Sequence, residues 1–377
     1  GRPRQLPLIS RNTTVEQLKK STKSGSPYFT KRRLVMEKWL RGIVSRGDNV
    51  WYITNPDGTF RATATLGWRG QEGGPDVDLT KQRDLWMFPM DLNIDEARVY
   101  KPLVDWGQRT GMISSWLGNE AVDRKITKLF DSKEDRDPVV CTDFTKFDQH
   151  FGPAMRTAAL GAYDLMFSGS GDYEAWKTDT YDAKYYIPIV IAWNKALMGE
   201  HGMASGSGGT NADETVGHSI LQTEAALTAG AQLNPNSMCL GDDGILTYKG
   251  IDVDHVIDIY TSHGQEMNET KQYVSTDDLT YLRRWHHKNY RINSVCVGVY
   301  STCRALGKLK YLERFHDPKV WGAKAVCSRS LSIIENCKYH PLREEFLDFC
   351  IKRDKFRLGI DIPGYLDNFG QEIEQAV

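Results

Sequence analysis

The segment Met238-Cys-Leu-Gly-Asp-Asp-Gly-Ile-Leu246 places a Gly-Asp-Asp tripeptide between two short apolar runs. Apolar runs on both sides of Asp and Gly predict a β-hairpin whose turn carries the two carboxylates. Such a turn needs no function of its own, because Asp and Gly are favoured turn residues in any case. Taken alone, the segment leaves a structural turn and a catalytic site equally open.

A second acidic segment lies upstream, in Pro138-Val-Val-Cys-Thr-Asp-Phe-Thr-Lys-Phe-Asp148. Its apolar start predicts a strand, so that Asp143 stands at the strand end and Asp148 in the loop that follows. A solvated loop could carry the same acids without further purpose. Carboxylates at the ends of two strands are explained better by cations between them, because Mg²⁺ prefers hard oxygen ligands. A pair of such ions suits in-line phosphoryl transfer, the chemistry of a nucleotide polymerase.

Length and composition indicate an ordinary globular protein with a large core. The chain has 377 residues, of which 40% are hydrophobic and 26% charged, enough for two or three subdomains. The seven cysteines show no zinc-ligand spacing and no disulfide framework. The longest apolar-looking stretch, 185–193, is too short to span a bilayer, so we expect no membrane partner. Because the chain begins with Gly1 rather than Met, we expect further sequence before it.

The net charge of −1 hides a gradient along the chain. The first 46 residues hold twelve Lys and Arg, against only Glu16 and Glu37. Such an excess can attract a phosphate backbone, with binding that weakens as salt rises. A solvated basic face is the alternative interpretation.

The periodicity of apolar residues predicts a mixed α+β protein. We expect helices over 154–167, 210–229, 253–263 and 342–355, a hairpin over 237–247, and a strand pair formed by 279–284 and 292–299. Glycine, proline and polar residues predict a loop at 71–78 and breaks at 168–172 and 178–182. The acids should gather at one end of the sheet.

Further motifs occur in a fixed order around the two acidic segments. They are Thr22–Tyr28, Lys81–Pro89, Gly202–Thr210 (Gly-Met-Ala-Ser-Gly-Ser-Gly-Gly-Thr), Glu266–Lys271 and Tyr281–Arg284. With them, residues 21–284 resemble a viral RNA-dependent RNA polymerase. The central motifs are most similar to those of double-stranded RNA viruses of the picobirnavirus and partitivirus type, and we expect the picobirnavirus group.

The resemblance implies a right-hand polymerase fold, with an antiparallel palm sheet packed on helices. It implies fingers at 1–138, the first part of the palm at 139–167, a fingers insertion at 168–201, the second part of the palm at 202–295 and a thumb at 296–377. The activity implied is RNA-directed RNA synthesis from NTPs, for viral genome replication and transcription.

Catalytic roles follow from the same resemblance. Asp143, Asp242 and Asp243 would bind two Mg²⁺ ions, with Mn²⁺ as a substitute. Asp148 would lie near the ribose of the incoming nucleotide. Lys271 would protonate the leaving pyrophosphate, although a lone lysine in a polar loop is as often only solvated.

The glycine-rich motif would contact the nucleotide through Ser205, Gly206, Thr210 and Asn211, because glycine lets a backbone approach a base or ribose closely. Ser205 and Thr210 would also help to fix Asp148. This chain departs from many relatives, which have Asn four residues after the Thr. Glu214 occupies that position here, so the ribose contact is open between Asn211 and Glu214.

The outer motifs would bind phosphate and RNA. Lys81 and Arg83 alternate as on a strand and would face the triphosphate. Ser24, Gly25, Pro27 and Tyr28 would line the template entry, with Tyr28 and Phe29 able to stack on a base. Arg283 and Arg284 would hold the nascent strand. A plain turn and a salt-bridged strand end are the respective alternatives.

The expected partners are template RNA, nascent RNA and NTPs, with viral capsid protein as a further candidate, in the virion interior or the host cytoplasm. Two other classes remain open at this point. One is a reverse transcriptase-like polymerase, against which the acid at Asp148 argues. The other is an inactive RNA-binding or capsid-associated protein of the same fold, against which the intact aspartates argue.

Overall fold

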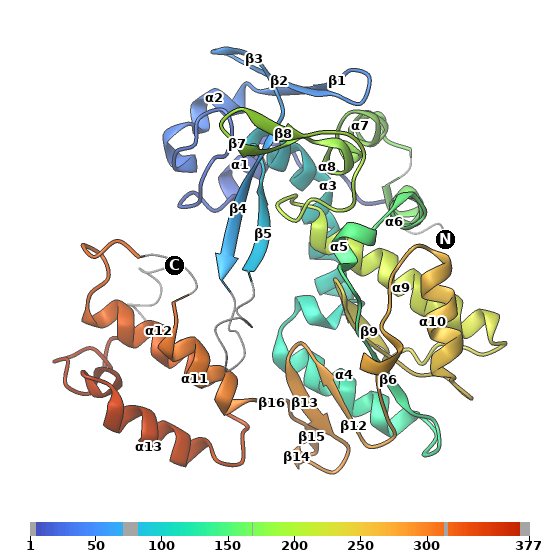
Figure 1. The fold of residues 1–377 in the computed structure, drawn as a ribbon, viewed down its shortest axis with the longest axis vertical. Coiled ribbons are helices and arrows are strands. Elements are labelled where there is room, and N and C mark those ends of the chain that lie inside the picture. The colour runs from blue at the N-terminus through green and yellow to red at the C-terminus, as the bar shows by residue number, and fades with distance from the viewer. Residues whose placement is uncertain (1–4, 71–81, 168, 313–315, 370–377) are drawn as a thin grey trace. The chain divides into compact units, whose positions relative to one another are not determined.

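Residues 5–70, 82–167, 169–312 and 316–369 are described by the computed structural model (Figure 1). They divide into two compact units. Unit 1 comprises Gly1–Gly67 and Asp84–Tyr281, and unit 2 comprises Trp68–Arg83 and Leu282–Val377. The division into fingers, palm and thumb segments stays a prediction.

Unit 1 contains both helices and strands. Its helices are α1 (Arg11–Gln17), η1 (Arg32–Leu34), α2 (Met36–Leu40), α3 (Met90–Thr110), η3 (Ser114–Trp116), α4 (Asn119–Ser132), α5 (Phe147–His150), α6 (Pro153–Phe167), α7 (Gly171–Trp176), η4 (Lys177–Tyr181), α8 (Ala183–Tyr186), α9 (Thr210–Thr228), α10 (Val253–Ser262) and η5 (Glu269–Lys271). Its strands are β1 (Ile43–Arg46), β2 (Trp51–Asn55), β3 (Gly58–Arg61), β6 (Val139–Thr142), β7 (Ile189–Ala192), β8 (Lys195–Leu197), β9 (Met238–Leu240), β10 (Asp243–Leu246), β11 (Tyr273–Ser275) and β12 (Asp278–Tyr281). Strands β4 (Ala64–Gly70) and β5 (Gln82–Met87) begin or end in unit 2.

The central sheet of unit 1 has the strand order β11-β6-β10-β9, and all its pairs are antiparallel. All of β6 is buried, as its β-branched and apolar residues require. Side chains from the sheet, such as Val140 and Leu246, share one core with Leu221 of α9 and Tyr260 of α10. Figure 1 shows α9 and α10 beside this sheet. The predicted antiparallel sheet packed on helices is confirmed for this part of the chain.

Two smaller sheets complete unit 1. Strands β1, β2 and β3 form an antiparallel meander. In the other sheet β4 pairs with β7 in parallel, with Ala64 opposite Ile189, and β7 and β8 form a hairpin. Their buried side chains, among them Trp51 and Ile53, form a second core with Phe88 and Leu92.

Unit 2 combines short strands with a helical region. Its elements are β13 (Arg284–His287), β14 (Arg291–Ile292), β15 (Val295–Cys296), β16 (Val299–Tyr300), α11 (Thr302–Lys310), α12 (Ala323–Glu335), α13 (Arg343–Arg353) and η6 (Arg357–Gly359). Strand β13 pairs with β16 and β14 with β15, both antiparallel. The helices enclose a core of their own around Ile334, Phe346 and Leu358.

Most elements predicted from periodicity are present. The predicted helices correspond to α6, α9, α10 and α13, and the predicted hairpin to β9 and β10. Helix α6 begins at Pro153, which suits the first helical position because proline lacks the N–H that would remain unpaired there. The predicted loop at 71–78 lies outside the described residues.

Two predictions were wrong. The segment 178–182 does not break the helical pattern, because Lys177–Tyr181 forms a π-helix between α7 and α8 in which Thr180 and Tyr181 are buried. Segments 279–284 and 292–299 do not pair as two long strands. Leu282 and Arg283 have positive φ and end the first run, and Asn293 and Ser294, also with positive φ, turn β14 back onto β15. Local turn geometry therefore overrides the apolar pattern there.

Within the described residues, no helix combines the length and the apolar character needed to cross a membrane.

Candidate active site

The acids of both predicted motifs lie at one end of the central sheet. Thr142, the last residue of β6, is opposite Gly244 of β10. Asp143 follows Thr142, and Asp243 precedes Gly244, so antiparallel pairing brings these two acids to the same sheet end. Asp242 lies in the turn between β9 and β10. Asp143 and Asp242 are exposed and Asp243 is half-buried.

The acids could supply ligands for a metal, but they do not form a closed cage. No group of three or more His, Cys, Asp or Glu within the described parts of the chain has the arrangement of a metal site. Asp143, Asp242 and Asp243 supply hard oxygen ligands only. Mg²⁺ is commonly held by one or two carboxylates, with substrate phosphates and water as the other ligands. The exposed carboxylates fit an ion whose coordination the substrate completes.

Helix α9 fixes the hairpin that carries Asp242. Thr215 Oγ1 accepts a hydrogen bond from Gly241 N at 3.0 Å, and His218 Nδ1 lies 2.9 Å from Gly241 O. Gln222 Nε2 donates to Met238 O at 3.0 Å and Ile245 O at 3.2 Å. These three side chains are spaced by three and four residues, so they share one helix face. Sequence reasoning missed them, although polar residues at helical spacing in a helix predicted to be buried were a signal.

Burial keeps His218 neutral, which makes Nδ1–H the donor to Gly241 O. The side chain is fully buried, and this burial lowers the pKa of His218 to about 4, against the opposing effect of the Gly241 carbonyl. A neutral imidazole beside the turn adds no positive charge that would compete with a metal ion for the carboxylates.

Glu214, not Asn211, lies close to Asp148 and Asp242. Burial in the first place, and then the charge of Asp148 and a hydrogen bond with it, raise the pKa of Glu214 well above its ordinary value. A neutral Glu214 can donate its proton to Asp148. Asp242 also contributes to the upward shift in the pKa of Glu214. Asn211 is exposed, and its Oδ1 accepts a hydrogen bond from Trp116 Nε1 at 2.8 Å.

A buried ionic cluster anchors the opposite side of the start of α9. Asp213 is fully buried, lies 3.1 Å from Lys184 Nζ, and accepts hydrogen bonds from the hydroxyls of Tyr100, Tyr163 and Tyr185, each at 2.8 Å. Burial and the nearby carboxylate raise the pKa values of all three tyrosines well above their ordinary range, so the hydroxyls remain donors. A buried charge needs this degree of pairing and hydrogen bonding.

The glycine-rich loop passes directly beside Asp148. Met203 N donates to Asp148 O at 2.7 Å, so the loop holds the backbone of Asp148. Ser205 Oγ donates to Asp84 O at 3.5 Å, and Thr210 Oγ1 donates within the loop to Ala204 O and Ser207 O. The two hydroxyls predicted to fix Asp148 thus bond to other backbone groups in this structure.

Lys271 is exposed, and its neighbour Gln272 forms hydrogen bonds with the backbone of Asp143. Gln272 Oε1 accepts from Asp143 N at 2.9 Å, and Gln272 Nε2 donates to Asp143 O at 2.7 Å. The amide therefore satisfies both backbone groups of Asp143. Sequence reasoning missed Gln272, because nothing in its neighbourhood marks a partner so distant along the chain. The assigned role of Lys271 stays a prediction.

The predicted template-entry segment makes hydrogen bonds to other residues of unit 1. Ser24 is buried, and its Oγ donates to Gly25 O and accepts from Thr30 N. Tyr28 donates to Asp57 Oδ2 at 2.6 Å, so its hydroxyl is engaged, whereas Phe29 is exposed. Pro27 is half-buried. Of the two rings predicted to stack on a base, Phe29 is the more accessible.

The remaining predicted cations belong to unit 2 or are not described. Arg83 is exposed on β5, and Arg283 is exposed at the turn before β13. Arg284 is buried, and its Nη2 donates to Gly298 O at 3.3 Å. Lys81 lies outside the described residues. RNA and nucleotide binding by these side chains stays a prediction.

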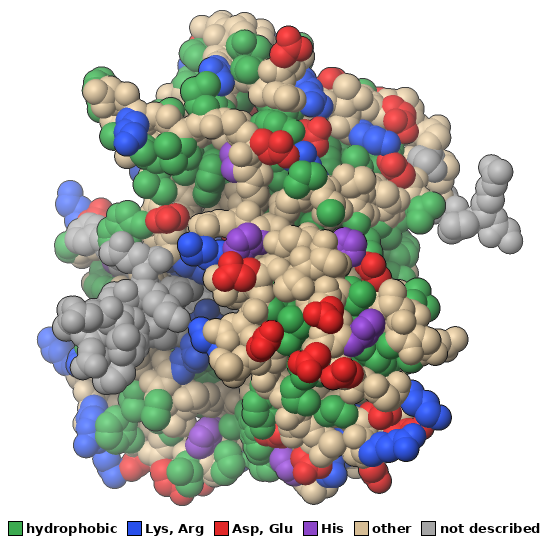
Figure 2. All heavy atoms as spheres, turned by 45° about the vertical axis from the view of Figure 1, so that its right-hand side comes forward, with side chains coloured by type: hydrophobic (Ala, Val, Ile, Leu, Met, Phe, Trp, Pro, Cys, Tyr) green, Lys and Arg blue, Asp and Glu red, His purple; other side chains and the backbone are tan. Residues whose placement is uncertain are grey.

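Surface charge differs between parts of unit 1. Six of the described basic residues among the first 46 are exposed, namely Lys19, Lys20, Lys23, Lys31, Arg33 and Arg41. Arg11 instead forms ion pairs with Asp91 and Asp95, so part of the basic excess is structural. Helix α10 exposes Asp254 and Asp258. Figure 2 shows several acidic side chains on one face of the molecule.

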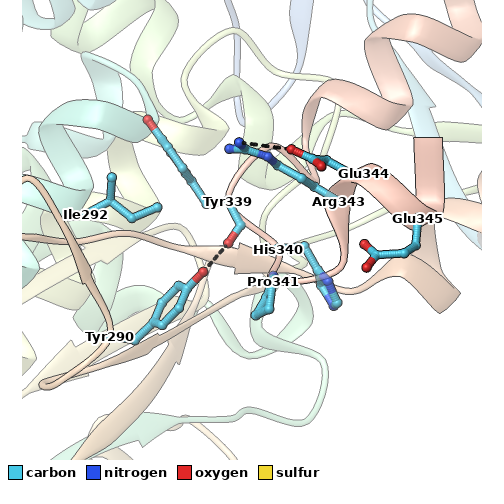
Figure 3. Close-up of a pocket in the computed structure, with 8 residues that line it drawn as sticks. All are labelled: Tyr290, Ile292, Tyr339, His340, Pro341, Arg343, Glu344 and Glu345. Atoms are coloured by element: carbon cyan, nitrogen blue, oxygen red, sulfur yellow. Dashed lines mark hydrogen bonds and ion pairs between the residues drawn. The ribbon is translucent and has the colours of Figure 1, made fainter. Parts of the chain in front are cut away.

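Unit 2 contains a polar pocket of about 320 Å³ (Figure 3). Tyr290 donates to Tyr339 O at 2.8 Å across it, and Arg343 lies 3.7 Å from Glu344. None of the predicted site residues lines this pocket.

Comparison with known proteins agrees with the motifs. Residues 9–345 match the family described as "Viral RNA-dependent RNA polymerase". The chain is 53% identical over 373 residues to a "Potential RNA-dependent RNA polymerase" of human picobirnavirus, covering 99% of this chain and 70% of that protein.

Solved structures agree as well. The crystal structure of the RNA-dependent RNA polymerase of a human picobirnavirus is 52% identical with a TM-score of 0.95, covering 99% of this chain and 71% of that one. The crystal structure of an insertion-loop deletion mutant of such a polymerase is also 52% identical, with a TM-score of 0.96. The match covers 99% of this chain and 73% of that one.

Proposed function

This chain belongs to the viral RNA-dependent RNA polymerases, and from that premise we propose that it extends RNA from NTPs by a two-metal mechanism on a right-hand polymerase fold. The biological role proposed is replication and transcription of a viral genome. Family membership supports a polymerase over a reverse transcriptase or an inactive binding protein. The observation that carries the mechanism is the β6–β10 register, which brings Asp143 and Asp243 to the same sheet end, beside Asp242.

Asp143 and Asp242 would hold the ions, with Asp243 supporting them from its half-buried position. Mg²⁺ or Mn²⁺ bound there would supply charge that lowers the pKa of the primer 3′-hydroxyl and stabilises the leaving pyrophosphate. The carboxylates orient the reacting groups, and the amide of Gln272 keeps the Asp143 backbone in place.

Asp148 and Glu214 would form the ribose side of the site. Their shared hydrogen bond leaves Asp148 with a fixed orientation at the loop that carries Met203. A carboxylate can accept a hydrogen bond from a 2′-hydroxyl, a group that a deoxyribose lacks. Selection of NTPs over dNTPs is therefore assigned to this pair.

The outer cations would act on phosphate. Lys81 and Arg83 would neutralise charge on the triphosphate, and Lys271 would supply a proton to the leaving group. Arg283, Pro27 and Tyr28 would contact RNA, whereas the buried Ser24 and Arg284 would hold the backbone near them. Template RNA, nascent RNA and NTPs are thus the proposed partners, and capsid protein is a further candidate in the virion interior or host cytoplasm.

The test is Mg²⁺-dependent incorporation of labelled NTPs and dNTPs on a single-stranded RNA template, with and without a supplied primer. Extension selective for NTPs, and lost in Asp242→Asn, is the expected result. Absence of extension with primer and with Mn²⁺ would contradict the proposed activity for this chain.

A further inference from the structure

We propose that Glu96 of α3 is a positioning residue for nucleotide addition, because its buried carboxylate holds the glycine-rich loop beside Asp148. The inference rests on the proposed function for its catalytic consequence, although the contacts can be tested without catalysis. Glu96 touches none of the groups assigned to chemistry; it acts through the loop.

The carboxylate of Glu96 binds two consecutive loop residues. Ser207 Oγ donates to Oε1 at 2.5 Å, and Gly208 N donates to Oε2 at 2.8 Å. Ser207 Oγ in turn accepts from Gly209 N at 3.0 Å. One side chain therefore orders three successive residues directly before α9 begins.

Asn93, one helical turn earlier on α3, extends the same attachment. Its Nδ2 lies within hydrogen-bond distance of Glu96 Oε2, at 3.2 Å, and of Gly206 O, at 3.3 Å. Arg32 Nη2 donates to Asn93 Oδ1 at 3.2 Å, which directs the Asn93 amide nitrogen toward the loop. The loop from Gly206 to Gly209 is thus bonded to a single face of α3.

Burial makes this attachment sensitive to the loss of one acceptor. Glu96 is fully buried, and burial raises its pKa, against the charge of Lys184 and the hydrogen bonds from Ser207 and Gly208. A buried donor that loses its partner has no water to replace it. Loss of either carboxylate oxygen would leave Ser207 or Gly208 without its acceptor, and the loop would move.

Movement of the loop would reach the site through backbone contacts. Met203 N bonds to Asp148 O at 2.7 Å, and a Cβ on Gly202 would lie 2.3 Å from the same oxygen. The far end of the loop leads into α9, which carries Glu214. Asp148 and Glu214 therefore lie at the two ends of the segment that Glu96 holds.

The test uses Glu96→Gln in the full chain, because glutamine keeps the volume but replaces one acceptor oxygen with a donor. We expect the KM for NTP to rise about tenfold and discrimination against dNTP to fall, with RNA affinity unchanged. Hydrogen exchange, measured without RNA or NTP, should speed up at Gly208 and Gly209 and not in β6 or β10. Arg98→Gln is the matched control: it removes a bond from the same helix to Ile9 O and should change none of these readouts.

A double-mutant cycle separates positioning from general packing. Ser207→Ala removes the hydroxyl that Glu96 accepts, so Glu96→Gln and Ser207→Ala should be non-additive in KM and in loop exchange. Arg98→Gln and Ser207→Ala should be additive. If Glu96→Gln fails to fold, Ser207→Ala alone should still raise the KM and the exchange at Gly209.

Wild-type KM and wild-type loop exchange in Glu96→Gln, or in Ser207→Ala where the former does not fold, would overturn the inference. Equal effects of Arg98→Gln would do the same. If the wild-type chain shows no extension at all, the proposed function fails, whereas the exchange data still decide whether Glu96 holds the loop.

Discussion

Thr142 lies opposite Gly244 across the antiparallel pair β6–β10. This register places Asp143 beside Asp243, with Asp242 in the adjoining turn. Side chains alternate along a strand, so a shift of one residue would move the acids to different faces of the sheet. The site therefore depends on one strand register, which is fixed by the buried residues of β6.

Asp143→Asn and Asp242→Asn should each lower nucleotide addition by at least about a thousandfold, because each removes a charged metal ligand. RNA affinity should stay within about twofold, since few phosphate contacts are lost. Asp243→Asn should cost less. Asp258→Asn, which removes an exposed carboxylate on α10, is the matched control and should keep wild-type rates. Primer-extension rates and RNA titrations measure both quantities, and near-normal rates in either main variant would contradict the metal assignment.

Glu214→Ala should lower both the rate and the discrimination between NTP and dNTP by about tenfold or more, because Asp148 loses its hydrogen-bond partner. Glu214→Gln keeps a donor and should remain closer to wild type. Asn211→Ala should have a small effect, because Asn211 is bonded to Trp116. Incorporation from mixtures of NTP and dNTP measures the discrimination, and incorporation of NTP alone measures the rate. Unchanged rate and selectivity in Glu214→Ala would exclude Glu214 from the ribose side.

Gly206→Ala should destabilise the protein by about 1–3 kcal/mol and impair nucleotide addition, because overpacking displaces the backbone. A Cβ at Gly206 would lie 1.5 Å from Trp86 O, a backbone atom that has little room to move. Gly161→Ala is the matched control: it lies in α6 with nothing within 4 Å of its Cβ, and should gain about 0.5–1 kcal/mol. Urea unfolding compares the two, and equal stabilities would show that the loop yields.

The contribution of His218 to the stability of the protein should fall as pH decreases from about 6.5 to about 4. Burial lowers the pKa of His218 to about 4, so across this window the unfolded chain binds the proton more strongly than the folded one. The contribution is at most about 3 kcal/mol. Burial raises the pKa of Asp91 to about 7, which acts in the opposite direction, since its folded form retains a proton longer as pH rises.

A difference between proteins isolates the part due to His218. Urea unfolding of the wild type and of His218→Gln should be compared at several pH values between 4 and 7. The variant should lose less stability than the wild type on acidification. If the free energy of unfolding changed with pH in the same way for both proteins, the pKa of His218 would not be lowered in the folded state.

The sequence predicted the parts of the site that lie close together along the chain. The Gly-Asp-Asp hairpin and helix α9 have the predicted type and nearly the predicted ends, because apolar periodicity and glycine determine them locally. Sequence comparison bears out the resemblance carried by the motifs. The roles of individual site residues were inferred by resemblance and remain for experiment.

What the sequence did not predict depends on long-range partners. His218 and Gln272 bond to backbone atoms, and a backbone atom leaves no trace in the residue types near it. Glu96 bonds to Ser207 and Gly208, which lie more than a hundred residues further along the chain. The choice between Asn211 and Glu214 likewise needed three-dimensional structure, because both follow Thr210 in the same helix. The π-helical turn at Lys177–Tyr181 was missed because its polar residues resemble a loop.

Helix α9 makes contacts on several sides, and these contacts restrict where residues can be inserted or deleted. Thr215, His218 and Gln222 hold the hairpin, while Asp213 is fixed by Lys184 and three tyrosines. One residue inserted between Asp213 and Thr215 would turn the following part of the helix by about 100° and misalign one of the two sets of contacts. Insertions and deletions should therefore be tolerated only beyond the helix. The exposed Gly230, whose surroundings are open, is a suitable position for an inserted tag.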